Sequence, residues 1–290
     1  MTTTPATIQI TPSLTQRAFM ECQTPEAAIL GSRGEGKTES ALMAMTYHAL
    51  QQPAHLRPLP CAVVRDTWKN LRRTTLTNLL EPRPGSFGAS ILPYLKVSDG
   101  GRVIEFPGHW RLQCFGIDSL GDISNFQGMN LGGLWFDEPA AAAANDIGHG
   151  LLKRAWEVAL TSLRYPCKTR AMITSNYPDD DHWMAKRFMA GHPDRVLFRV
   201  PRGENPHVTN AYRLQMAEAL KDDSNLLKRL VLGEFGTLYE GVAVTPMYSD
   251  EVHVAGSVLT PDLALPGFRF WDGGLTPACL IAQVSPMGQL

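Results

Sequence analysis

Residues 31–38 constrain this chain more than any other stretch. Their order, Gly-Ser-Arg-Gly-Glu-Gly-Lys-Thr, fits the phosphate-binding P-loop pattern G-x-x-x-x-G-K-[ST]. They follow a short apolar run, residues 27–30, which predicts the strand that precedes such a loop. The glycines of a P-loop let backbone N–H groups surround a triphosphate. We expect Lys37 to neutralise the outer phosphates and Thr38 to offer its hydroxyl to Mg²⁺.

Composition narrows the class of protein. The chain has 290 residues, 27 basic and 28 acidic, so its net charge of −1 provides no general attraction for nucleic acid, and any DNA contact must be a local patch. The five cysteines are scattered without a C-x-x-C pair, which argues against a disulfide framework or a zinc site. Neither a signal peptide nor a membrane-spanning run is visible, so we expect a soluble intracellular protein.

A second motif, which is acidic, follows the apolar residues 134–136. Asp137 and Glu138 end this predicted buried strand, at the sheet edge where open α/β sheets bind ligands. We expect Asp137 to support Mg²⁺ through water and Glu138 to act as the general base. Taken alone, such a pair is more often an ordinary strand end or helix cap. The P-loop upstream favours the functional interpretation.

The remaining pattern predicts a mostly parallel sheet with helices on both faces and an added antiparallel hairpin, the α/β fold of P-loop NTPases. Two interpretations are open for the basic residues Arg65, Lys69, Arg72 and Arg73: a solvated face, or a contact with DNA or another subunit. Predicted strands cover residues 61–65, 102–106, 110–115, 170–176, 196–200, 268–274 and 278–284. Predicted helices cover 13–22, 38–50, 66–80 with Asp66 as N-cap, 151–163, 210–220 and 225–232.

The order of the motifs is more informative than any one of them. It runs through a P-loop containing Arg33, Val63-Val64-Arg65 before a basic helix, an Ile-x-Phe hairpin, Phe136-Asp137-Glu138, Thr174-Ser175-Asn176, Glu204-Asn205-Pro206, Leu232-Gly233-Glu234-Phe235-Gly236 with Glu240-Gly241, and Trp271-Asp272-Gly273-Gly274-Leu275-Thr276-Pro277-Ala278. Over most of its length, from about residue 16 to residue 278, the chain resembles the large terminase subunit of tailed bacteriophages. That family is the ATP-driven motor that packages DNA into a procapsid.

The resemblance implies roles for individual residues. Glu138, Arg33 and Lys37 would be catalytic, with Arg33 aimed at the γ-phosphate, and Thr38 and Asp137 would hold Mg²⁺. Residues 174–176 match the family's coupling motif. A glutamine at position 16 could read an adenine edge, or it could be an ordinary surface residue. The residues expected to contact ATP are Gln16, Gly31, Ser32, Arg33, Gly34, Glu35, Gly36, Lys37, Thr38, Glu39 and Asn176.

The same resemblance divides the chain. Residues 1–232 would form the ATPase motor domain, 233–262 a linker, and 263–290 the first hairpin of an RNase H-like nuclease domain. Asp272 would be a metal ligand of that nuclease, but two-metal cleavage needs several carboxylates. We therefore expect a truncated chain without nuclease activity.

The family also implies partners: double-stranded DNA, the portal protein, the small terminase subunit, and further copies in a ring, in the host cytoplasm and away from any membrane.

The chain departs from the family pattern at one position. Many terminases carry an Arg-Gly pair about ten residues before the Asp-Glu pair, proposed as an arginine finger, but here Gln127 precedes Gly128. Arg154 and Arg164 are alternative candidates for the finger.

Two other functions stay open at this point. A helicase- or recombinase-like ATPase would share the nucleotide motifs, although a second recombinase-like domain and a use for the Trp271-Asp272-Gly273 strand are missing. A nucleotide-gated scaffold without catalysis would not need to retain Lys37 and Glu138.

Overall fold

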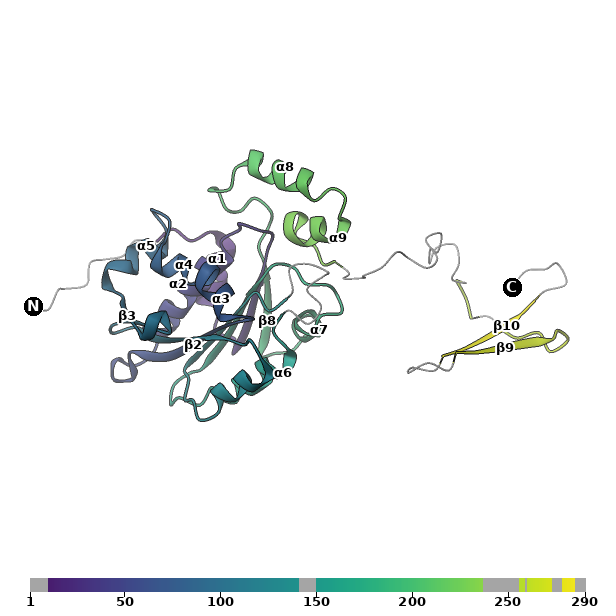
Figure 1. The fold of residues 1–290 in the computed structure, drawn as a ribbon, viewed down its shortest axis with the longest axis horizontal. Coiled ribbons are helices and arrows are strands. Elements are labelled where there is room, and N and C mark those ends of the chain that lie inside the picture. Colours follow the sequence, from purple (N-terminus) through teal and green to yellow (C-terminus); the bar gives the residue numbers. More distant parts are fainter. Residues whose placement is uncertain (1–9, 141–149, 237–255, 259, 273–277, 285–290) are drawn as a thin grey trace, which may run out of the picture. The chain divides into compact units, whose positions relative to one another are not determined.

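The computed structural model describes residues 10–140, 150–236, 256–258, 260–272 and 278–284 (Figure 1). The chain divides into two compact units, Met1–Glu240 and Gly241–Leu290. The larger unit contains the P-loop and a wide sheet, and the smaller one contains a two-stranded hairpin.

The sheet of the larger unit has eight strands. Six neighbouring strands, from β5 to β8 in the sheet order, run parallel, while β4 and β3 add an antiparallel extension at one edge. This arrangement confirms the predicted fold class. In sheet order the strands are β3 (Lys96–Ser98), β4 (Val103–Phe106), β5 (Trp110–Gly116), β2 (Leu59–Arg65), β6 (Gly133–Asp137), β7 (Arg170–Ser175), β1 (Glu26–Leu30) and β8 (Arg195–Arg199).

Both faces of this sheet are covered, as Figure 1 shows. Alternate residues of one strand point to opposite faces, so Ala27 and Ile29 of β1 join one apolar cluster and Ala28 and Leu30 join the other. The first cluster is closed by α1 (Leu14–Glu21), α2 (Lys37–Leu50), α4 (Thr77–Leu80) and α5 (Phe87–Ile91). The second is closed by α6 (Lys153–Leu160) and α7 (Trp183–Met189). Burial on two sides explains why the central strands are continuous apolar runs.

The helical stretch after β2 differs from the prediction. Its N-cap is Thr67, whose hydroxyl accepts from the Asn70 N–H at 3.0 Å, and not Asp66. Asp66 lies one residue too early for that bond, and its carboxylate accepts from the Asn70 side-chain amide instead. The stretch is also not one regular helix. It consists of α3 (Trp68–Asn70), a π-helical turn (Leu71–Thr75) and α4.

Two other predicted helices change in extent. The amphipathic stretch at 151–163 forms only α6, because Leu152 has an extended backbone, occupies the N-cap position and is 47% exposed. The stretch at 225–232 is α9 (Ser224–Leu226) followed by a π-helical turn (Leu227–Leu232). The preceding helix, α8 (Asn210–Ala219), agrees with the prediction.

The smaller unit consists of β9 (Gly267–Asp272) paired antiparallel with β10 (Ala278–Gln283), which confirms the predicted hairpin. Residues 273–277 of the tryptophan-aspartate motif and the Glu240-Gly241 pair lie outside the described residues. Within the part of the chain that the structure describes, no helix is long and apolar enough to cross a membrane.

His48 makes the stability of the larger unit depend on pH. Its side chain is buried in α2, and Nε2 lies 3.2 Å from the Gly132 carbonyl, so this nitrogen must donate. Burial lowers the pKa of His48 to about 4, from an ordinary value of 6.5. As the pH falls from 6.5 to about 4, the unfolded chain binds a proton that the folded chain does not, and stability is lost.

We therefore expect the free energy of unfolding to fall by about 1–3 kcal/mol between pH 7 and pH 4 through this group. Urea unfolding of the parent and of His48→Asn at both pH values measures the effect, and the variant should lose less stability on acidification. His207→Gln, at an exposed position, serves as the control. Equal losses in parent and His48→Asn would contradict the assignment.

Candidate functional site

The P-loop connects β1 to α2 at the carboxyl edge of the sheet. Gly34 and Gly36 have positive φ values of 88° and 76°, which glycine adopts without strain. A Cβ at Gly36 would lie 2.7 Å from Nε2 of Gln16, so a larger residue would require the Gln16 side chain to move. Gly36 is the N-cap of α2 and provides no side-chain cap. The first N–H groups of this 14-residue helix therefore suit an anion such as a phosphate.

Lys37 is the first residue of α2, and its side chain is buried beside the loop. Its Nζ donates to the Ser32 carbonyl at 2.9 Å and to Oδ1 of Asn176 at 3.0 Å. Burial lowers the pKa of Lys37, while the carboxylates of Glu138, Asp137 and Glu35 act in the opposite direction. The ammonium group is thus fixed in place between the loop and the tip of β7.

Glu138 lies directly after β6 and has a φ of 49°, an uncommon conformation for a residue other than glycine. Its Oε2 accepts from the backbone N–H of Asn176 at 2.9 Å and from Nδ2 of the same residue at 3.1 Å. Burial raises the pKa of Glu138, and Lys37 is the main opposing charge. Asn176 therefore joins Lys37 to Glu138 through one side-chain amide.

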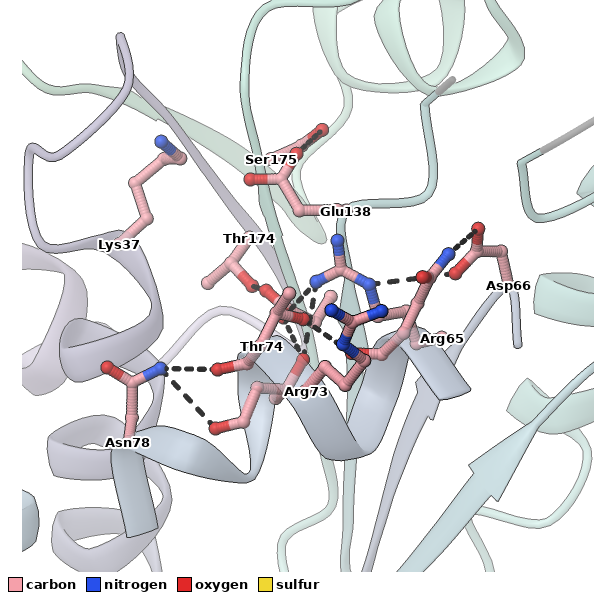
Figure 2. Close-up of polar contacts among 12 residues, drawn as sticks. Lys37, Arg65, Asp66, Arg73, Thr74, Asn78, Glu138, Thr174 and Ser175 are labelled. Carbon is pink, nitrogen blue, oxygen red and sulfur yellow. Dashed lines mark hydrogen bonds and ion pairs between the residues drawn. The ribbon is translucent and has the colours of Figure 1, made fainter. Parts of the chain in front are cut away.

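Asp137 is buried and accepts hydrogen bonds at both carboxylate oxygens. Thr174 donates to Oδ1 at 2.6 Å, and Nη1 of Arg65 and the hydroxyl of Thr75 donate to Oδ2. Figure 2 shows Lys37 and Arg65 on opposite sides of Glu138 and Thr174 in that view. Arg65 is thus neither a solvated basic residue nor a surface contact, since its side chain turns inward and is only 16% exposed.

The other basic residues of that stretch, Lys69, Arg72 and Arg73, are exposed. Both surface interpretations therefore stay open for these three residues. Sequence reasoning missed Arg65 and Thr75 as neighbours of Asp137. The position of Arg65 at the end of an apolar strand could have indicated its contact with Asp137. Thr75 lies inside a predicted helix, and nothing in the sequence there indicates such a contact.

Three residues predicted to contact the nucleotide direct their side chains at protein groups. Nε2 of Gln16 donates to the Gly36 carbonyl at 3.3 Å, which holds the end of the P-loop. Glu39 accepts from the N–H groups of Phe87 and Gly88 and caps α5. Glu35 turns toward the segment that precedes α8. These bonds hold the P-loop and α2 against neighbouring elements, and the nucleotide contacts predicted for the three residues stay predictions.

The Glu35 contacts explain the Glu204-Asn205-Pro206 motif. The buried Glu35 carboxylate accepts from the Gly203 N–H at 3.0 Å, the Asn205 N–H at 2.9 Å and Nη2 of Arg213 at 3.2 Å. Nδ2 of Asn205 donates to the Gly34 carbonyl at 2.6 Å. Glu204 accepts from the N–H and hydroxyl of Thr15 in α1. The motif therefore fastens the P-loop to α1 and α8.

The remaining candidates are spread over the molecule. Thr38 is half-buried in the first turn of α2, and Arg33 is exposed at the tip of the loop, where its N–H donates to the Leu230 carbonyl. Gln127, Arg154 on α6 and Arg164 are all exposed. Nε of Arg164 donates to the Met129 carbonyl at 3.0 Å. Asp272 is the last residue of β9 in the smaller unit, and its role as a metal ligand stays a prediction.

The donor set at the P-loop fits magnesium better than a transition metal. Among the described residues, no group of three or more His, Cys, Asp or Glu side chains could hold a metal by itself. Mg²⁺ is usually bound through one or two carboxylates together with substrate phosphates. The Thr38 hydroxyl and the Asp137 carboxylate supply hard oxygen atoms of that kind.

A P-loop strand, a nearby strand that leads into an Asp-Glu pair, and a mostly parallel sheet covered on both faces define a P-loop NTPase. The family model for the terminase large subunit, T4likevirus-type, N-terminal, matches residues 28–241. The chain therefore belongs to this terminase family, as its motif order indicated. A search of curated protein sequences gave no match.

Solved structures with the same fold come from several phages. The large terminase of a thermophilic bacteriophage, in complex with ADP, has a TM-score of 0.58 and 15% identity, over 94% of this chain and 65% of that chain. The HK97 bacteriophage large terminase has a TM-score of 0.52 and 12% identity, over 98% and 63%. The large terminase ATPase domain of Thermus phage P74-26 has a TM-score of 0.50 and 15% identity, over 78% and 94%. The chain thus spans 65% of the thermophilic bacteriophage protein.

Replacing Glu35 by alanine should loosen the P-loop from the segment before α8. The change leaves two N–H donors and the Arg213 guanidinium without their buried acceptor, so we expect a loss of about 3 kcal/mol in the free energy of unfolding. Hydrogen exchange at the Gly203 and Asn205 amides should accelerate. Glu218→Ala, which removes an exposed ion pair with Lys221, should change stability by less than about 1 kcal/mol. Unchanged exchange at both amides would contradict the role.

Proposed function

We propose that this chain is the ATP-hydrolysing motor part of a viral DNA-packaging terminase. The observation that carries the proposal is the hydrogen-bonded chain from Lys37 through Asn176 to Glu138, which links a phosphate-binding cation to a half-buried carboxylate. Membership of the terminase family supports it. So do the structures of the thermophilic bacteriophage large terminase in complex with ADP and with ATP-gamma-S.

The proposed chemistry assigns each group a task. The N–H groups at the start of α2 and the Lys37 ammonium bind the phosphates. Thr38 and Asp137 would hold Mg²⁺, which would neutralise charge on the phosphates when bound. Glu138 is the general base that orients and polarises the attacking water, and burial raises the pKa of its carboxyl group. Arg33, exposed on the loop, supplies positive charge to the γ-phosphate.

The residues predicted at the nucleotide would then act in two ways. Gly31, Ser32, Gly34 and Gly36 offer backbone groups, while Gln16, Glu35 and Glu39 act by holding the loop and α2 in shape. A shift of Lys37 on phosphate binding would move Asn176 and with it Glu138, because the Asn176 amide bonds both residues. An arrangement of this kind would couple binding to hydrolysis.

The partners and the domain plan follow from the family. We propose that the motor acts on double-stranded DNA in a ring docked on the portal protein, together with the small terminase subunit, in the host cytoplasm. The motor domain would comprise residues 1–232, followed by a linker at 233–262. Residues 263–290 would begin the nuclease domain, with Asp272 as one ligand of its metal site. A finger from a neighbouring subunit would have to replace the missing arginine at Gln127.

Two substitutions test the proposed hydrolysis. Lys37→Ala should abolish both nucleotide binding and turnover, because the phosphates lose their main cation. Glu138→Gln should lower kcat by about 100-fold or more with nucleotide affinity nearly unchanged, because the amide preserves shape but cannot accept the proton. Phosphate release and the binding of a fluorescent ATP analogue measure the two effects. Glu157→Gln, on the exposed face of α6, is the matched control, and parental turnover by Glu138→Gln would refute the base.

A second experiment separates a packaging motor from a helicase. The full-length protein, supplied with procapsids, small subunit and ATP, should protect linear double-stranded DNA from added nuclease, and Glu138→Gln should eliminate this protection. The same protein should leave a forked duplex annealed. Robust strand separation without DNA protection would favour the helicase- or recombinase-like alternative.

A further inference from the structure

The buried carboxylate of Asp137 is held by three donors from three different elements. Nη1 of Arg65, at the end of β2, lies 2.9 Å from Oδ2, and the Thr75 hydroxyl bonds the same oxygen. Thr174, on β7, donates to Oδ1. The Asp137 side chain is 2% exposed, and that of Arg65 is 16% exposed, so little water competes for these bonds.

The direction of the two hydroxyl bonds can be assigned from chemistry. Nε1 of Trp135 can only donate, and it lies 2.7 Å from Oγ1 of Thr174. The Thr174 proton is therefore free to point at Asp137. Nη1 of Arg65 likewise donates to Oγ1 of Thr75 at 3.3 Å, which leaves the Thr75 proton for Asp137. Both oxygens of Asp137 thus have fixed donors, and its side chain has one well-defined orientation.

Thr75 reaches Asp137 from an unusual backbone. It ends the π-helical turn Leu71–Thr75, in which the Leu76 N–H donates to the Leu71 carbonyl five residues earlier at 2.9 Å. Thr75 is 1% exposed, whereas Arg73 and Thr74 beside it are exposed. π-Helical turns are rare and are found frequently at functional sites. Here the turn brings the Thr75 hydroxyl to Asp137, while the side chains of Arg73 and Thr74, labelled in Figure 2, are exposed.

We propose that Arg65 and Thr75 are positioning residues, which orient the Asp137 carboxylate for the Mg²⁺ that accompanies the nucleotide. They act through Asp137 and do not touch the nucleotide. Mg²⁺ demands near-octahedral geometry, and groups that orient a metal ligand typically change metal affinity or activity by about 10–100-fold when removed. The inference rests on the proposed function, because it assumes a metal–nucleotide complex at the P-loop.

Arg65 could instead oppose Mg²⁺ binding through its positive charge. The Arg65 cation sits beside the carboxylate, so a purely electrostatic role would weaken Mg²⁺ binding, and its removal would tighten binding. Positioning and electrostatic repulsion therefore predict shifts of opposite sign.

The test measures how much Mg²⁺ is needed for half-saturation of a fluorescent, non-hydrolysable ATP analogue, and separately the affinity for that analogue in EDTA. Thr75→Val removes the hydroxyl at nearly constant volume, and Thr75→Ser restores it. Arg65→Gln removes the cation. The matched controls are Thr74→Val and Arg73→Gln, because both side chains are exposed on the same turn.

We expect Thr75→Val and Arg65→Gln to need about 10-fold more Mg²⁺, with affinity in EDTA unchanged. Thr75→Ser and the two controls should behave as the parent does. Circular dichroism establishes that each variant is folded, and Thr75→Ser keeps the test decisive if Arg65→Gln does not fold.

Unchanged Mg²⁺ dependence in Thr75→Val, or tighter binding in Arg65→Gln, would overturn the positioning role and leave the proposed function standing. If the parent itself failed to bind the analogue at any Mg²⁺ concentration, both the inference and the proposed function would fall.

Discussion

The structure depends on how it accommodates two successive carboxylates that end a buried strand. Asp137 and Glu138 would be strongly unfavourable there as ionised groups without partners. Each accepts hydrogen bonds from donors distant in the sequence: Asp137 from Arg65, Thr75 and Thr174, and Glu138 from Asn176. The elements that contribute these donors must therefore meet at one edge of the sheet.

Sheet order satisfies this requirement. β7 lies between β1, which leads into the P-loop, and β6, which carries the acidic pair. The polar residues that end β7 consequently face both. Thr174 turns to Asp137, while Asn176 bonds Lys37 on one side and Glu138 on the other. The short chain of contacts between the phosphate-binding lysine and the acidic pair is a result of parallel strand pairing.

Sequence patterns identified most strands of the sheet, because a strand buried on both faces leaves a short apolar run bounded by polar residues. They were less successful with helices. The stretch after β2 was predicted as one helix, but the π-helical turn at Leu71–Thr75 interrupts it. That irregularity brings Thr75 to Asp137, a contact across 62 residues that no local period encodes. Glu35, Glu39 and Gln16 were assigned to the nucleotide from their position near the loop, although their side chains bond protein groups.

By itself, the sequence determined the chemical inventory: a P-loop, an Asp-Glu pair at a strand end, and a motif order that indicated the terminase family. Each single motif is a short-range pattern that residue types at neighbouring positions decide, and the motif order is their succession along the chain. The tertiary structure alone decided which donor serves which carboxylate. The sequence left Arg65 either on a solvated face or in a contact with DNA or another subunit, and in the fold it is the partner of Asp137. The physical reason is that strand order and burial, not separation along the chain, bring buried charges to their partners.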